Sequence, residues 1–124
     1  MISTSLCGIK LENPTVLASG IMGVSASSLR RVADAGAGAV TKKSIGPKPR
    51  EGHDNPTMVE VVGGYLNAMG LPSEGVEESV KELENYKGSV PLIASFYGTN
   101  ADEFASVAKA IDGKADLLEA NISC

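Results

Sequence analysis

Short apolar runs alternate with amphipathic stretches along this chain, and the alternation predicts strands that alternate with helices. The runs have almost no polar face, which is typical of parallel strands buried on both sides. The amphipathic stretches carry their apolar residues on one helical face, and from Phe104 to Ile111 the spacing is i, i+3, i+4 and i+7. The predicted strands cover residues 15–18, 38–41, 90–94 and 116–121, and the predicted helices cover 25–35, about 75–86 and a segment that opens at residue 100.

Capping residues indicate where the second and third helices begin. Ser73 can cap the second helix, and Glu77 and Lys81 can form an i,i+4 pair on its wet side. Asn100 and Glu103 have the spacing of a capping box at the start of the third helix.

The order of the elements favours a parallel α/β fold. Residues 2–12 are predicted to form a hairpin around Gly8, and a Pro/Gly-rich loop over 45–58 leads into an extended segment, 58–62, of a second hairpin. The pattern fits a (β/α)₈ barrel or an open doubly wound sheet, and the missing G-x-G-x-x-G turn weakens the open sheet. A barrel typically needs about 250 residues. The 124 residues are therefore predicted to be one domain, 1–124, that covers about the first four βα units of a TIM barrel behind an N-terminal hairpin.

Composition narrows the class of protein further. Fifteen acidic residues outnumber eleven basic ones and Trp is absent, which argues against a nucleic-acid or anionic-membrane surface. No apolar stretch is long enough to span a membrane and no signal-peptide pattern is present, so we expect a cytoplasmic protein with reduced thiols. Cys7, in an apolar strand, is expected to be a buried structural thiol. His53 lies in a Pro/Gly loop without a second ligand at metal spacing and is expected to be solvated, so no metal site is predicted.

Polar groups follow several of the apolar runs. Because the carboxyl ends of parallel strands meet at one edge, hydroxyl and amide groups there are typical of an α/β active site and can bind the edge of a flavin ring. Each one alone could equally be a polar strand-to-loop turn. The candidates of this kind are Ser19, Ser44, Ser95 and Asn121.

Lys43 is the strongest single candidate for chemistry. Side chains alternate between the faces of a strand, so Lys43 shares a face with Thr41, whereas Lys42 shares a face with Val40. Val40 is the natural residue to pack under the helices. This register turns Lys43 inward, where an ammonium group suits an anionic ligand or the charge of a reduced cofactor. The alternative is a pair of solvated lysines at the start of a loop.

Two further segments can carry chemistry. In the glycine-rich cluster 63–72, Asn67 can donate and accept in the plane of an amide or imide, and the N–H groups of 69–71 can face a carboxylate; the alternative is a plain turn. Cys124 follows the last apolar run, and a partly ionised thiol there can act as a base.

Several pieces of the sequence, taken in order, carry a resemblance to a known family. They are Asn13-Pro14 to Ala18-Ser19-Gly20, Thr41-Lys42-Lys43-Ser44, Pro49-Arg50-Glu51-Gly52, Asn55-Pro56, Asn67-Ala68-Met69-Gly70-Leu71 and Asn121-Ile122-Ser123-Cys124. With them the chain resembles class 1 dihydroorotate dehydrogenases, and within that class the cysteine-base type that works with an NAD-linked electron-transfer subunit.

The resemblance implies an FMN-binding barrel that oxidises dihydroorotate to orotate in pyrimidine synthesis. It implies Cys124 as the catalytic base and a partner subunit with an iron–sulfur cluster and FAD, within a homo- or hetero-oligomer. The residues implied to contact FMN are Ser19, Lys43, Ser44, Asn121 and, where the family often has an asparagine and the contact would be shorter or lost, Ser95. The residues implied to bind dihydroorotate or orotate are Lys43, Asn67, Ala68, Met69, Gly70, Leu71 and Asn121.

Two other functions remain open at this point. One is another flavin barrel, such as the pyrimidine-reducing domain of dihydropyrimidine dehydrogenase, and the other is a catalytically inert half-barrel. The phosphate loops of a flavin barrel usually follow its seventh and eighth strands. The 124 residues alone are therefore expected to be inactive.

Overall fold

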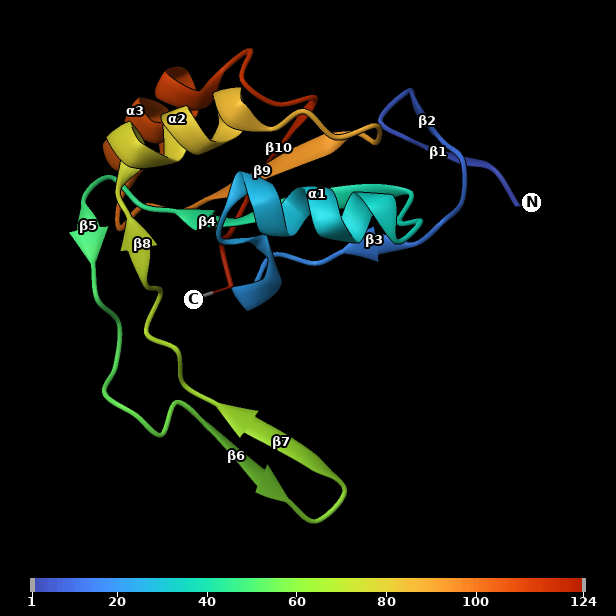
Figure 1. Ribbon diagram of the computed structural model, residues 1–124. Helices are drawn as coiled ribbons and strands as arrows, with labels where there is room; N and C mark the ends of the chain where they lie inside the picture. Colours follow the sequence, from blue (N-terminus) through green and yellow to red (C-terminus); the bar gives the residue numbers. More distant parts are fainter. Residues whose placement is uncertain (1, 124) are drawn as a thin grey trace.

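A four-stranded parallel sheet forms the centre of the computed structural model, which describes residues 2–123 (Figure 1). Its strands lie in the order β10-β9-β4-β3, the reverse of chain order without a swap, as expected for consecutive βα units. Every neighbouring pair is parallel. The strands are β3 (Val16–Leu17), β4 (Ala39–Ile45), β9 (Leu92–Phe96) and β10 (Leu117–Ala120).

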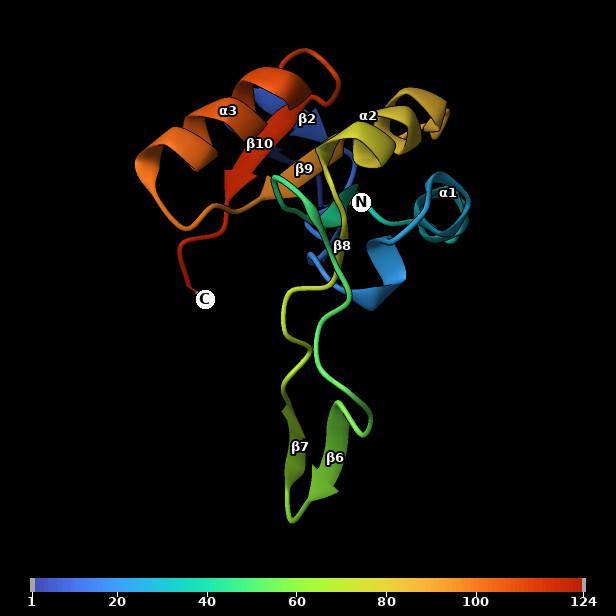
Figure 2. The ribbon, with the colours of Figure 1, turned by 90° about the vertical axis from the view of Figure 1, so that its left-hand side faces the viewer.

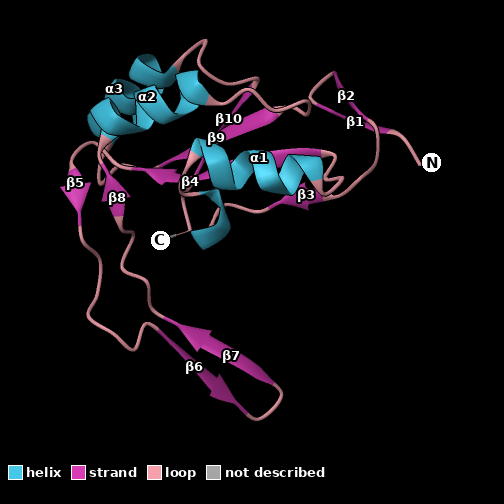
Figure 3. Cartoon of the chain, viewed as in Figure 1, coloured by secondary structure: helices cyan, strands magenta, loops and turns pink. Residues whose placement is uncertain are grey.

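Three α-helices pack on one face of this sheet, as Figures 1 and 3 show. They are α1 (Ala26–Asp34), α2 (Val76–Asn85) and α3 (Ala101–Ile111), and the predicted apolar faces point to the sheet. Leu29, Leu83 and Ile111, one from each helix, are almost fully buried against it. The rings of Phe96 and Phe104 meet edge to face with centroids 5.8 Å apart, which fixes α3 on β9.

The N-terminal hairpin covers the opposite face at the amino ends of the strands. β1 (Thr4–Leu6) pairs antiparallel with β2 (Ile9–Leu11), as predicted. Leu11 packs with Ala39 and Ile93 in a second core cluster on the inner face. The inner face is thus apolar at the amino ends of the strands, which leaves their carboxyl ends for polar chemistry.

The prediction that Cys7 is buried is wrong. Cys7 and Gly8 form the two-residue turn of the hairpin, with φ angles of +50° and +83°, and Cys7 is exposed and free. A two-residue turn that suits the twist of the strands needs positive φ at both positions, which Gly8 supplies without strain. The apolar neighbours of Cys7 suggested a strand interior, but the glycine sets the turn one residue earlier.

Side chains cap the helices in part as predicted. Asn100 accepts a hydrogen bond from Glu103 N at 3.0 Å, while the carboxylate of Glu103 reaches the N–H and hydroxyl of Thr99 rather than Asn100. These bonds lower the pKa of Glu103. Ser73 does not cap α2, whose N-cap is Gly75 and has no side-chain bond.

The ion pair predicted on α2 also differs in its partner. Lys81 binds Glu78, at i−3, rather than Glu77. On a helix, residues three and four apart are both neighbours, so sequence spacing alone does not select between them.

Replacing Asn100 by alanine is expected to lower the free energy of unfolding by about 1 kcal/mol, because Glu103 N loses its partner. Ser106→Ala, at an exposed position of the same helix, is the control and should change stability by only a few tenths of a kcal/mol. Urea unfolding of the complete protein measures both. Equal effects would show that the cap contributes nothing.

A long excursion leaves the sheet between β4 and α2. Its two arms are pinned at the base by β5 (Pro49–Arg50) and β8 (Ser73–Glu74), which sequence analysis did not predict. Its tip is the hairpin of β6 (Met58–Val61) and β7 (Gly64–Asn67), which projects from the body in both views of Figures 1 and 2. None of the helices formed by residues 2–123 has the length and apolar character needed to span a bilayer.

Candidate functional site

A β-bulge at the carboxyl end of β4 determines which side chains face inward. Between Lys42 and Ile45 the register against β9 shifts by one residue, so Lys43 and Ser44 together lie opposite Ser95. Such a bulge places two residues of one strand against one residue of its partner and re-aims their side chains. Lys43 and Ser44 can therefore both turn their polar side chains to the inner face although they are adjacent in sequence, which strict alternation does not allow.

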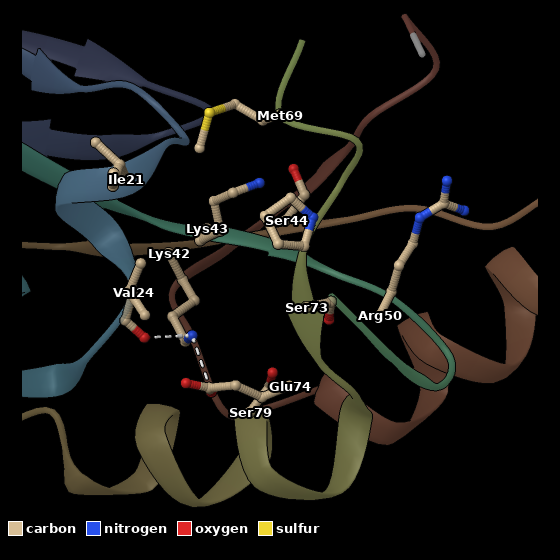
Figure 4. A pocket seen from close by; sticks show the side chains of 11 residues that line it. Ile21, Val24, Lys42, Lys43, Ser44, Arg50, Met69, Ser73, Glu74 and Ser79 are labelled. Atoms are coloured by element: carbon tan, nitrogen blue, oxygen red, sulfur yellow. Dashed lines mark hydrogen bonds and ion pairs between the residues drawn. The ribbon is translucent and has the colours of Figure 1, made fainter. Parts of the chain in front are cut away.

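β4 also continues four residues beyond the predicted end of the strand at Thr41, and Lys42 is buried within it. The side chain of Lys42 is only 3% exposed, and its Nζ donates to Val24 O at 2.6 Å and lies 3.7 Å from Glu74 Oε2. Burial lowers the pKa of Lys42, and Glu74 opposes that shift. In Figure 4 Lys42 points toward Val24 and Glu74 while Lys43 points the other way, which is the alternation expected from the sequence.

The hydroxyl and amide groups that the sequence predicted meet at Ser44, and we call this group of Ser19, Ser44, Ser95 and Asn121 the Ser44 cluster. Ser44 Oγ lies 3.0 Å from Ser95 Oγ and 3.1 Å from Ser19 Oγ, and it accepts a hydrogen bond from Asn121 Nδ2 at 3.2 Å. These residues come from four different strands or their carboxyl ends. Ser44 and Ser95 are buried, whereas Ser19, Asn121 and Lys43 are half-buried and can meet a ligand.

Asn121 has its side chain fixed at both ends. Ser123 donates from its N–H and its hydroxyl to Asn121 Oδ1, at 3.2 and 2.8 Å, and this assigns Nδ2 to the Ser44 side. The chain after β10 is thus folded back on Asn121. Cys124, the predicted base, lies outside the described residues.

The second half of the site is the segment from Asn67 to Leu71, which we call the 67–71 loop. Its last three carbonyl groups are each held by a donor from elsewhere: Met69 O by His53 N at 3.2 Å, Gly70 O by Arg50 Nε at 2.7 Å, and Leu71 O by the Tyr97 hydroxyl at 3.1 Å. In a planar trans peptide the N–H points opposite to the preceding carbonyl. The N–H groups of Gly70 and Leu71 therefore point away from His53 and Arg50.

Two successive residues of this loop have a left-handed backbone conformation. Gly70 and Leu71 have φ angles of +74° and +52°. The glycine adopts this conformation freely, and a Cβ at Gly70 would also lie only 2.5 Å from the ring of His53. His53 is exposed, as predicted, but its main-chain N–H binds Met69 O of the loop.

A cavity of about 330 Å³ joins the two halves (Figure 4). Lys43, Ser44, Arg50 and Met69 contribute to its wall, and so do Lys42 and Glu74 from the helix side of β4. The predicted site residues Ser19, Ser95, Asn121, Gly70 and Leu71 do not line it. Asn67 and Ala68, at the end of β7 and just after it, are exposed and do not line the cavity. Among residues 2–123, no group of three or more His, Cys, Asp or Glu side chains is placed to hold a metal ion.

Sequence analysis missed the side chains that hold the 67–71 loop. Arg50 belongs to one of the pieces that carry the family resemblance, and Tyr97 follows the third apolar run, yet neither position has a local pattern that predicts its partner. Their partners are 20 and 26 residues away in sequence.

Parallel βα units with polar groups gathered at the carboxyl ends of the strands are the arrangement of a (β/α)₈ barrel, and the four parallel strands of this chain match part of such a barrel. A crystal structure of ligand-free dihydroorotate dehydrogenase from Eimeria tenella has this fold and superimposes with a TM-score of 0.79 at 22% identity, over 95% of this chain and 37% of the other. This confirms the predicted partial barrel.

Sequence comparison gives the family. The dihydroorotate dehydrogenase family model matches residues 1–124, and the chain belongs to this family. It is 53% identical to the catalytic subunit of dihydroorotate dehydrogenase B (NAD(+)) from Methanocaldococcus jannaschii, with all of this chain and 42% of that protein aligned. The same subunit from Methanothermobacter thermautotrophicus is 52% identical over all of this chain and 41% of its own length. The chain spans about two fifths of these curated relatives.

Proposed function

We propose that the complete protein containing this chain is a flavin-dependent dihydroorotate dehydrogenase, which oxidises (S)-dihydroorotate to orotate in de novo pyrimidine biosynthesis. Family membership supports the reaction class. The observation that carries the proposal is that Lys43 and Ser44, the centre of the Ser44 cluster, line the same cavity as Met69 of the 67–71 loop, which we call the substrate loop from here on. A site built in this way can hold a planar ring on one side and an anionic substrate on the other.

The donor set of the inner face fits FMN. Hydroxyl groups donate or accept, Asn121 does both through its amide, and Lys43 only donates, which matches a ring edge that mixes carbonyl, imide and ring-nitrogen groups. We propose that Ser19, Lys43, Ser44 and Asn121 hold the flavin. Ser95 is fully buried behind Ser44, so we propose that it acts through the Ser44 hydroxyl. When bound, the flavin supplies a two-electron acceptor.

The substrate loop and two side chains are proposed to bind dihydroorotate. The N–H groups of Gly70 and Leu71 suit its carboxylate, and the amide of Asn67 suits its ring. Lys43, which lines the cavity together with Met69, and Asn121 of the Ser44 cluster are proposed to touch substrate as well as flavin. The remaining loop residues proposed to line the substrate are Ala68 and Met69.

Cys124 is proposed to be the base. A thiolate there would take the proton from the carbon next to the substrate carbonyl, while the neighbouring carbon would give up a hydride to the flavin as two-electron acceptor. Lys43 places a positive charge at the inner face, which stabilises negative charge that develops there during the reaction.

The proposed partner is an electron-transfer subunit with an iron–sulfur cluster and FAD. The support is that the similar archaeal proteins are named as catalytic subunits of an NAD(+)-linked enzyme. We propose a cytoplasmic homo- or hetero-oligomer that contains both kinds of subunit.

Purification of the complete protein tests the proposal directly. We expect a yellow protein that releases FMN on denaturation and whose flavin is bleached anaerobically by dihydroorotate but not by dihydrouracil. Bleaching by dihydrouracil instead would identify a dihydropyrimidine-type enzyme. A colourless protein that binds no flavin would support an inert barrel.

Ser44→Ala is expected to weaken FMN binding about tenfold, because it removes the common partner of Ser19, Ser95 and Asn121 and leaves buried polar groups unsatisfied. Quenching of flavin fluorescence on titration of the apoprotein gives the Kd. Ser89→Ala, at an exposed position near the amino end of β9, is the control and should leave the Kd unchanged. The same Kd for both variants would remove Ser44 from the flavin site.

A further inference from the structure

Tyr97 is a buried polar side chain to which the proposed chemistry gives no role. It follows β9 directly, is 6% exposed, and donates from its hydroxyl to Leu71 O at 3.1 Å. Its own N–H is bound to Ile45 O at 3.0 Å. The main chain of Tyr97 is thus fixed to the end of β4, and its side chain reaches from the sheet to the substrate loop.

The ring and hydroxyl of Tyr97 occupy space that is open because residue 46 is a glycine. A Cβ on Gly46 would lie 2.4 Å from Tyr97 Oη, so any larger residue at 46 would displace the ring. The ring therefore passes between the end of β4 and the loop. A side chain packed in this way has little freedom and holds its hydrogen-bond partner in one place.

The partner of Tyr97 is a strained residue. Leu71 has φ +52°, which is unfavourable for a residue with a branched side chain and persists only where surrounding contacts hold it. Pro72 follows, and its ring limits the conformations of Leu71 further. The hydrogen bond from Tyr97 fixes the direction of the Leu71 carbonyl, and with it the peptide that carries the loop into Pro72.

The other two carbonyls of the turn are held within the excursion itself, by Arg50 of β5 and the main chain of His53. Tyr97 differs because it directly follows β9 of the central sheet, two residues after Ser95 of the Ser44 cluster. It is therefore placed to set the position of the loop relative to that cluster.

We infer that Tyr97 is a positioning residue, which holds the left-handed turn of the substrate loop in register with the inner face of the sheet so that its N–H groups meet the substrate carboxylate. The inference rests on the proposed function. It predicts a loss in substrate affinity when the hydroxyl is removed, with little loss in the rate of the bound complex.

Tyr86 provides a matched control. Its hydroxyl also donates to a main-chain carbonyl, Val90 O, at 3.1 Å, but near the amino end of β9. Burial raises the pKa of Tyr86 and of Tyr97 alike, so both hydroxyls are donors at neutral pH. Replacing either by phenylalanine removes one hydroxyl-to-carbonyl bond and keeps the ring.

The test compares the two variants in the complete, flavin-loaded protein. For Tyr97→Phe we expect the Kd of orotate and the KM of dihydroorotate to rise about fivefold, with kcat changed less than twofold. We also expect faster amide hydrogen exchange over residues 67–71. For Tyr86→Phe we expect wild-type affinity and wild-type exchange in this segment.

Equal orotate affinities for the two variants, or unchanged exchange over the substrate loop in Tyr97→Phe, would overturn the inference while the proposed function stands. A wild-type protein that binds flavin but neither binds orotate nor is bleached by dihydroorotate would overturn the proposed function, and the inference with it. A fall in kcat without a change in Kd would place Tyr97 in the chemical step rather than in positioning.

Discussion

Replacing Cys124 by serine in the complete protein is expected to keep the flavin bound and to slow its reduction by dihydroorotate about a hundredfold or more. A hydroxyl is a far weaker base than a thiolate, whereas its size is close enough to preserve packing. Because Ser123 is anchored on Asn121, the preceding main chain should be unaffected by the change. Anaerobic single-turnover bleaching of the flavin measures the rate.

Cys7→Ser is the matched control, because Cys7 is an exposed thiol in the turn of the N-terminal hairpin. It should reduce at the wild-type rate. An unchanged rate for Cys124→Ser would assign the base to another part of the complete protein.

Lys43→Ala is expected to slow flavin reduction about a hundredfold, and Lys42→Ala to do so much less. Only Lys43 reaches the inner face, while Lys42 is bound to Val24 O and Glu74 on the helix side. The loss at Lys42 should instead be one of stability, about 1–3 kcal/mol, because Val24 O and Glu74 lose a charged donor. Single-turnover bleaching and urea unfolding separate the two effects.

Similar losses of flavin reduction from both lysine variants would contradict the register of β4. So would a stability loss at Lys43 that matched the loss at Lys42. The two residues are adjacent in sequence, so each serves as the control for the other.

Much of the fold follows from local patterns in the sequence. The apolar faces around Leu29, Leu83 and Ile111 predict which side of each helix meets the sheet, because burial of such a face stabilises an amphipathic helix more than intrinsic propensity does. The four parallel strands follow from runs that lack a polar face. The positions that differ are Cys7, in a turn, and Ser73, in β8, and in both cases a glycine one or two residues on decides the local backbone.

The candidate site was predictable in its members but not in its construction. Polar residues after apolar runs indicated Ser19, Ser44, Ser95 and Asn121, and the parallel topology brings them together. The bulge that turns Ser44 to the same face as Lys43 depends on pairing with β9 and leaves no mark in the local sequence.

Long-range contacts explain the rest of what the sequence did not predict. Lys42 is buried in β4 because Glu74, 32 positions later, and Val24 O neutralise and bind its ammonium group; a charged residue that ends an apolar run normally indicates the end of a strand. The base of the excursion, where β5 meets β8, depends in the same way on residues brought together by the fold.

The central claim is that the inner face of the sheet and the substrate loop form one flavin and dihydroorotate site. A crystal structure of the complete protein with orotate bound tests it most directly. We predict FMN in contact with Ser44, Asn121 and Lys43, and the orotate carboxylate on the N–H groups of Gly70 and Leu71. Orotate bound away from the substrate loop, or a flavin that contacts neither Ser44 nor Lys43, would contradict the claim.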